Sequence, residues 1–202
     1  EFRRVLFRSA HHLYPIILMH IVLQGFMACG KSNLGPKLAK SLGYSFVDLD
    51  LACEKLFNTT VAGFVNAHGL AAFRYTERAL LKTLLKASEP QVIALGGGTL
   101  THQHVLNLVK KKSIVVYLNT PLPTLIKRLQ KNFKTRPLIN GLTPAERKIF
   151  IRALWEKRQK YYTQSHLVWA PPFSVKTLKL RIMEFKSYTA SCSAENTNRF
   201  DF

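Results

Sequence analysis

The sequence predicts an α/β protein in which a central five-stranded parallel sheet is flanked by helices on both faces, giving three layers. Two observations predict this fold. Short apolar runs alternate with longer helical segments along the chain, which is the pattern of parallel strands joined by crossover helices. Glycine-rich or acidic turns follow the first three runs, and ligands of such sheets bind at the carboxyl ends of the strands. We therefore expect the functional residues at that edge.

The predicted strands are short and apolar, as is typical of strands buried on both faces. They cover residues 21–23, 45–47, 91–95, 114–118 and 167–169. The predicted helices cover residues 34–42, 51–87 with breaks near Asn58 and Gly69, 101–111, 122–129, 144–164 and 175–186. Gly43 is expected to end the first helix, and Thr143 with Glu146 supplies a capping box for the fifth. A polar, basic stretch over about 130–142 indicates a mobile lid.

Length and composition are those of one globular domain. The chain has 202 residues, 47% of them hydrophobic, and no apolar run approaches the roughly 20 residues that a membrane span needs. The 30 basic and 11 acidic residues give a net charge of +19. This charge attracts anions but does not distinguish nucleotide phosphates, a carboxylate substrate or a nucleic acid. Three cysteines without C-x-x-C spacing favour a reducing compartment, so we expect a cytoplasmic protein.

Both ends of the chain are expected to lie outside the domain, which covers residues 19–187. Residues 1–18 are Arg-rich and do not match a secretory signal. We expect them to be an extension, non-native or disordered, upstream of a native start at Met19. Residues 188–202 are rich in Ser, Thr and Asn and are expected to form a disordered tail.

Residues 25–32 form a phosphate-binding motif. Their sequence, GFMACGKS, fits G-x-x-x-x-G-K-[ST] and lies between a predicted strand and a predicted helix, which is the context that the motif requires. The glycines let backbone N–H groups point at phosphate oxygens, and the helix N-terminus adds positive charge. Lys31 is expected to reach the β- and γ-phosphates of ATP, and Ser32 to ligate Mg²⁺. The predicted nucleotide-binding residues are Gly25, Ala28, Cys29, Gly30, Lys31, Ser32 and Asn33.

Two aspartates follow the second predicted strand. Asp48 and Asp50 are two residues apart, so their carboxylates lie on the same side of an extended chain. One can hold Mg²⁺ through water, and the other can orient an acceptor hydroxyl and take its proton. Alternatively, Asp50 is only the N-cap of the next helix. The sequence leaves both interpretations open.

Arg74 and Glu77, in the second predicted helix, also have two interpretations. They can form a surface ion pair at positions i and i+3, or Glu77 can hold Arg74 so that its guanidinium binds a substrate carboxylate. Gly96, Gly97 and Gly98 follow the third strand, which we expect beside the phosphate loop. Three consecutive glycines indicate a backbone that another group approaches closely, and a loose turn is the alternative.

Basic residues are dense in and after the lid. Part of this run is a solvated helix face, but Arg136 directly precedes Pro137, which fixes the local backbone. A lid arginine can stabilise the charge that develops during phosphoryl transfer, and closure excludes water as a competing acceptor. We therefore predict that Arg136 contacts the nucleotide and takes part in catalysis with Lys31 and Asp50.

Together these residues resemble the shikimate kinase family, over about residues 19–186. The resemblance is carried by the phosphate loop, the D-x-D after the second strand, and the motifs FRYTE at 73–77, LGGG at 95–98, RPL at 136–138 and RQKYY at 158–162. It implies a P-loop kinase fold with a mobile lid, with ATP and Mg²⁺ as cofactors. The activity that it implies is phosphorylation of the 3-hydroxyl of shikimate, on the route to chorismate and the aromatic amino acids.

The resemblance also implies individual roles. Asp50 would hold shikimate hydroxyls and assist deprotonation of the attacking one, while Arg74 and Arg158 would clamp the carboxylate. The expected substrate-binding residues are Asp50, Arg74, Gly96, Gly97, Gly98 and Arg158, and the expected metal ligands are Ser32 and Asp48. The resemblance further implies a monomer, with no nucleic-acid or membrane partner.

The sequence departs from the family pattern in two places. Leu70 follows Gly69 where the family usually has Glu, and the lid core at 130–135 is not a close match. A second lid cation therefore stays open among Arg128, Lys131 and Lys134. The alternatives are another small-molecule P-loop kinase, of the gluconate or nucleoside monophosphate type, and a non-catalytic P-loop protein whose charge serves nucleic acid.

Overall fold

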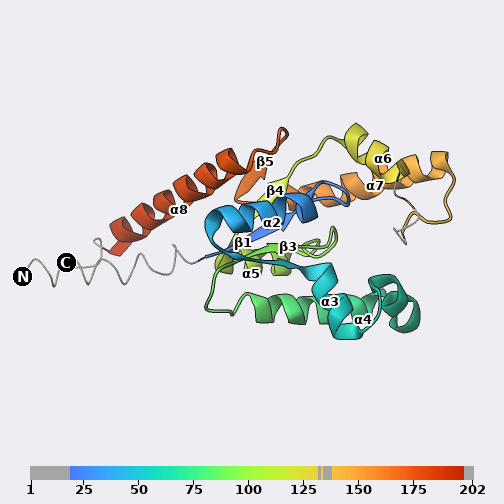
Figure 1. Ribbon diagram of the computed structural model, residues 1–202, viewed down its shortest axis with the longest axis horizontal. Helices are drawn as coiled ribbons and strands as arrows, with labels where there is room; N and C mark the ends of the chain where they lie inside the picture. The colour runs from blue at the N-terminus through green and yellow to red at the C-terminus, as the bar shows by residue number, and fades with distance from the viewer. Residues whose placement is uncertain (1–18, 132, 134–137, 198–202) are drawn as a thin grey trace, which may run out of the picture.

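Five parallel strands form the central sheet, in the spatial order β2-β3-β1-β4-β5 (Figure 1). The computed structural model describes residues 19–131, 133 and 138–197. The strands are β1 (His20–Gln24), β2 (Ser45–Asp48), β3 (Gln91–Ala94), β4 (Ser113–Leu118) and β5 (Leu167–Trp169). They confirm the predicted parallel sheet. Because β3 pairs directly with β1, the glycine-rich segment after β3 reaches the phosphate loop after β1.

The helices of the described residues cover both faces of this sheet. They are α2 (Lys31–Leu42), α3 (Leu49–Phe57), α4 (Val61–Leu84), α5 (Gln103–Lys112), α6 (Leu122–Lys131), α7 (Pro144–Tyr162) and α8 (Val175–Thr197). Figure 1 shows α2, α6, α7 and α8 on one side of the sheet and α3, α4 and α5 on the other. The three-layer arrangement is therefore as predicted.

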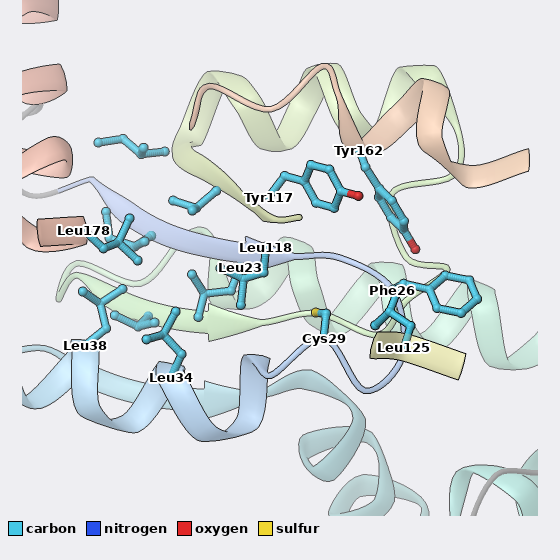
Figure 2. Close-up of a cluster of buried hydrophobic side chains, with 14 of the residues drawn as sticks. Leu23, Phe26, Cys29, Leu34, Leu38, Tyr117, Leu118, Leu125, Tyr162 and Leu178 are labelled. Atoms are coloured by element: carbon cyan, nitrogen blue, oxygen red, sulfur yellow. The ribbon is translucent and has the colours of Figure 1, made fainter. Parts of the chain in front are cut away.

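Two hydrophobic clusters, one on each face, hold the layers together. Successive side chains of a strand point to opposite faces, so Ile21 and Leu23 of β1 join the cluster beneath α2 and α8, whereas Val22 joins the cluster with α4 and α5. Figure 2 shows Leu23 and Leu118 of the sheet in the first cluster, above Leu34 of α2. The core thus fixes the sheet between the helices that carry the polar groups described below.

Local signals end the helices where the sequence predicts. Gly43 and Asn58 adopt left-handed conformations, with φ of 72° and 52°, at the carboxyl ends of α2 and α3. Gly69 breaks α4 with φ of 83° and ψ of 160°. Pro36 is the sixth of the twelve residues of α2, where proline cannot donate one hydrogen bond of the helix ladder.

The end of the chain differs from our expectation. We predicted disorder from residue 188, but α8 continues to Thr197. No glycine or proline interrupts this segment, and the hydroxyls of Thr189 and Ser191 donate to carbonyls four residues earlier, at 3.0 Å each. Residues 1–18 and 198–202, also covered by our predictions, lie outside the described residues. Within those that are described, no helix combines the length and apolarity needed to cross a membrane.

Leu38 offers a test of this packing. Its side chain is 0% exposed between α2 and the sheet, so Leu38→Ala should lower the free energy of unfolding by about 2–5 kcal/mol. Leu180→Ala is the matched control, because Leu180 is 54% exposed on α8 and its truncation should change the value by less than about 0.5 kcal/mol. Urea unfolding measures both. Equal losses in the two variants would contradict the packing described.

Candidate active site

The phosphate loop connects β1 to α2 and requires glycine at its first position. Gly25 has φ of 149°, and a Cβ there would lie 2.8 Å from the sulfur of Cys29 and 3.0 Å from the carbonyl oxygen of Leu118. Gly30, at the amino end of α2, has φ of 111°. These positive φ angles let the loop backbone turn tightly, which a loop needs if several of its N–H groups are to point at one phosphate.

Several side chains brace the loop through its carbonyl oxygens. Lys31 Nζ donates to the carbonyls of Gly25 (2.9 Å) and Phe26 (3.2 Å). From other elements, the Thr120 hydroxyl donates to the Cys29 carbonyl and Arg128 Nη1 to the Ala28 carbonyl, each at 2.9 Å. Of the three basic residues left open by the sequence, Arg128 is thus in contact with the loop.

Ser32 and Asp48 meet at the carboxyl ends of β1 and β2. The Ser32 hydroxyl donates to Asp48 Oδ2 at 2.9 Å. The other oxygen of Asp48 caps α3, accepting from the backbone N–H groups of Asp50 and Leu51 at 3.1 and 3.4 Å. Asp48 is therefore the N-cap, and the alternative that Asp50 is only a cap is wrong.

Asp50 lies in the first turn of α3, because the chain leaves the extended conformation at Leu49. Both aspartates nevertheless face one cavity of about 250 Å³, together with the phosphate loop. The cavity is lined by Met27, Ala28, Cys29, Gly30, Lys31, Ser32, Asn33, Asp48, Asp50, Leu95 and Gly97. Of the predicted nucleotide-binding residues within the described chain, Gly25 alone does not line it.

The environment of Asp50 raises its pKa to about 6. Burial is the largest cause, followed by repulsion from the carboxylates of Glu77 and Asp48, while Lys31 and Arg74 act in the opposite direction. A carboxyl group with a pKa near neutral pH can gain and lose a proton under ordinary conditions, which is what proton transfer requires.

Glu77 is a buried carboxylate that organises the side chains around the glycine triplet, where the predicted acceptor-binding residues lie. It is 0% exposed, accepts from Arg74 Nη1 at 2.7 Å, and accepts from the Thr99 hydroxyl at 2.8 Å. The Arg74 side chain is 23% exposed. The interpretation as a surface ion pair is therefore wrong, because Glu77 is buried and bonds Arg74 from the interior of the protein.

The glycine triplet is the point where the acceptor-side residues converge. A Cβ on Gly96 would lie 2.7 Å from Asp50 Oδ1, and one on Gly98 would lie 2.5 Å from Arg74 Nη2. A Cβ on Gly97 would lie 3.1 Å from Nη1 of Arg158, which comes from α7. The side chains of Asp50, Arg74 and Arg158 therefore pack directly against the glycine backbone, as the interpretation of a closely approached backbone predicts and a loose turn does not.

The structure also adds residues that sequence reasoning did not single out. Thr99 and Thr120 brace the two loops, and Tyr162 donates from its hydroxyl to the Gly97 carbonyl at 2.5 Å. Threonine is too common for such roles to show in one sequence. Tyr162 is the second tyrosine of the RQKYY motif, which carries the family resemblance but assigns this side chain no role. Arg136, predicted in the lid, lies outside the described residues.

Comparison with known proteins gives one family. A family model described as shikimate kinase matches residues 27–171. A shikimate kinase from Chlorobium chlorochromatii is 44% identical over 121 residues, which cover 60% of this chain and 63% of the relative. One from Flavobacterium johnsoniae is 38% identical over 146 residues, covering 72% and 85% respectively.

Solved structures show the same relationship. The shikimate kinase of Acinetobacter baumannii, in complex with shikimate, has a TM-score of 0.74 and 29% identity, covering 85% of this chain and 94% of its own. The Bacteroides thetaiotaomicron enzyme has a TM-score of 0.70 and 29% identity, covering 82% and 96%. A gluconokinase from Sinorhizobium meliloti shares the fold alone. It is 14% identical, with a TM-score of 0.57, and the match covers 89% of this chain and 98% of its own.

The raised pKa of Asp50 makes a prediction about stability. A carboxyl group that holds its proton more tightly in the folded chain destabilises the fold once it ionises, so the cost is absent below about pH 4, grows up to about pH 6 and is constant above. Asp50→Asn should therefore raise the melting temperature at pH 7.5 by about a few degrees, and much less at pH 4.5. Thermal unfolding at both pH values measures the difference.

Glu184→Gln is the control for this experiment. Glu184 is 64% exposed and paired with Arg181 at 3.2 Å on the surface of α8. Its neutralisation removes the same charge from a basic protein and should not raise the melting temperature. A gain in both variants would show that overall charge, not the site, explains the effect.

Proposed function

The chain belongs to the shikimate kinase family, and on that premise we propose that it transfers the γ-phosphate of ATP to the 3-hydroxyl of shikimate. The product would be shikimate 3-phosphate, on the route to chorismate and the aromatic amino acids. One observation carries the proposal: Asp50, Arg74 and Arg158 converge on one glycine loop beside the phosphate loop. A proton acceptor and two cations therefore face the place where a small anionic alcohol would meet a nucleotide.

On the nucleotide side, the phosphate loop and Lys31 would hold the β- and γ-phosphates. Ser32 and Asp48 would hold Mg²⁺, because a hydroxyl and a carboxylate oxygen 2.9 Å apart at the strand ends are the hard ligands that this ion prefers. When bound, Mg²⁺ neutralises charge on the phosphate oxygens. Arg128, already bonded to the loop, and Arg136 of the lid would add positive charge near the nucleotide.

On the acceptor side, Asp50 would accept the hydroxyl proton while the hydroxyl oxygen bonds to the γ-phosphorus and ADP leaves. Arg74 and Arg158 would bind the shikimate carboxylate, since guanidinium groups bind carboxylates in bidentate geometry. Glu77 prevents Arg74 from turning away, and the backbone at 96–98 would contact the ring. The proposal thus gives a role to each of the charged groups found nearest to Gly96, Gly97 and Gly98, namely Asp50, Glu77, Arg74 and Arg158.

The setting of the enzyme belongs to the same proposal. We infer a monomer in the cytoplasm, acting on a small molecule without a nucleic-acid partner. Cys29 and Cys53 are free and buried thiols, which suits a reducing compartment. The positive charge of the chain suits ligands that are all anions, namely ATP, shikimate and their phosphorylated products.

A coupled assay of ADP release tests the function directly. With Mg²⁺ and ATP, shikimate should stimulate release strongly, whereas gluconate and nucleoside monophosphates should leave the rate near background. These acceptors belong to P-loop kinases that do not require the combination of Asp50, Arg74 and Arg158. Stimulation by gluconate or a nucleotide, without stimulation by shikimate, would refute the proposal.

Asp50→Asn tests the proposed base. Loss of the proton acceptor should lower kcat by at least about 100-fold, with ATP affinity nearly unchanged because Asp50 does not brace the phosphate loop. Steady-state kinetics and calorimetric binding of ATP measure the two effects. Since the same variant is expected to be more stable at pH 7.5, unfolding cannot account for the loss. A variant that keeps most of its turnover would remove Asp50 from the mechanism.

A further inference from the structure

Tyr162 joins α7 to the glycine loop. Its side chain is 2% exposed, and its hydroxyl donates to the carbonyl oxygen of Gly97 at 2.5 Å. The ring stacks on Tyr117 of β4, with centroids 5.1 Å apart. Figure 2 shows Tyr162 descending from α7 beside Tyr117, with its hydroxyl pointing toward the carboxyl edge of the sheet. The stacking on Tyr117 therefore fixes the direction in which the Tyr162 hydroxyl donates.

The bond to Gly97 differs in kind from the bonds of the neighbouring glycines. The Gly96 carbonyl accepts from the backbone N–H of Thr99 (3.3 Å), and the Gly98 carbonyl from the Thr101 hydroxyl (2.8 Å). Both donors lie three residues later in the same loop, so these two bonds are internal to the loop, which the Thr99 hydroxyl separately attaches to Glu77 of α4. The bond from Tyr162 attaches the loop to another element.

That element also carries Arg158, one helical turn before Tyr162. A Cβ on Gly97 would lie 3.1 Å from Arg158 Nη1 and 3.3 Å from the backbone nitrogen of Met27 in the phosphate loop. Gly97 thus lies between the nucleotide side and the acceptor side. In the function proposed above, its position relative to both would set how far an acceptor hydroxyl lies from the γ-phosphate.

We propose that Tyr162 is a positioning residue for phosphoryl transfer, which holds the Gly96–Gly98 backbone at a fixed distance from Arg158 and the phosphate loop through its hydrogen bond to Gly97. The proposal rests on the function proposed above, because it assigns the glycine loop to the acceptor. Tyr162 itself touches no reacting atom. It acts by aligning the carboxylate clamp with the backbone that contacts the ring, and misplacement of a reactant by about 1 Å can cost about 100-fold in rate.

The nucleotide side should not depend on this bond. The phosphate loop has its own braces in Lys31, Thr120 and Arg128, which bond its carbonyls directly. Loss of the Tyr162 hydroxyl should therefore change the KM for shikimate and leave the KM for ATP nearly unchanged. A general loss of folding would affect both substrates.

Tyr162→Phe is the test, because it removes the donor and keeps the stacked ring. The KM for shikimate should rise about tenfold and kcat should fall, while the KM for ATP stays within about twofold. A second measurement does not need activity. Amide hydrogen exchange of a peptide covering residues 95–101 should be faster in the variant than in the parent protein.

Tyr117→Phe is the matched control. It removes a phenol from the same stack, one that accepts from Gln159 Nε2 at 2.9 Å, and leaves the bond to Gly97 in place. This variant should keep the parent KM values and the parent exchange rate at 95–101. Equal effects in the two variants would show that the stack, not the bond, matters, and would overturn the proposal.

Parent-like kinetics and exchange in Tyr162→Phe would overturn it as well, leaving Tyr162 a core residue only. If the parent protein does not phosphorylate shikimate, the proposed function fails, and the exchange experiment still decides whether Tyr162 holds the loop. Faster exchange at 95–101 in Tyr162→Phe alone would then support the positioning role for another acceptor. Unchanged exchange would reject it.

Discussion

The acceptor side of this protein depends on one buried charge, the carboxylate of Glu77. A fully buried carboxylate must be paired and hydrogen-bonded, or its desolvation destabilises the fold. Glu77 meets this requirement through Arg74 and Thr99, and those two bonds set the geometry around them. One directs a guanidinium toward the glycine loop, and the other attaches that loop to α4. The same charge contributes to the raised pKa of Asp50.

The two halves of the site are stabilised in different ways. The phosphate loop is contiguous in sequence, and its shape follows from Gly25, Gly30 and the start of α2. The acceptor half is assembled from α3, α4, the turn after β3 and α7, and its residues span positions 50 to 158. It exists only when the layers are packed, so the hydrophobic clusters on both faces of the sheet position it as much as its polar groups do.

This difference explains how much the sequence could predict. The strand and helix segments, the strand–turn–helix setting of the phosphate loop and the caps at Gly43 and Thr143 depend on neighbouring residues, and the structure confirms them. Interpretation of Asp50 stayed open because capping by Asp48 depends on where the strand ends, which a sequence locates only within a few residues. The bond from Tyr162 to Gly97 spans 65 positions and leaves no local signal. The helix at 188–197 was missed because Ser and Thr composition was weighed above the lack of any helix breaker.

Asp50 also shows why a site of this kind limits stability. Glu77 and Asp48 raise the pKa of Asp50, and each also makes a structural contact. Glu77 bonds Arg74, whereas Asp48 caps α3 and accepts from Ser32. The cations that lower its pKa, Lys31 and Arg74, bond the phosphate loop and Glu77 respectively. Removing either carboxylate would relieve the repulsion but would also break one of these bonds. The repulsion is therefore retained at the site, and the two buried clusters of the sheet must offset its cost in free energy.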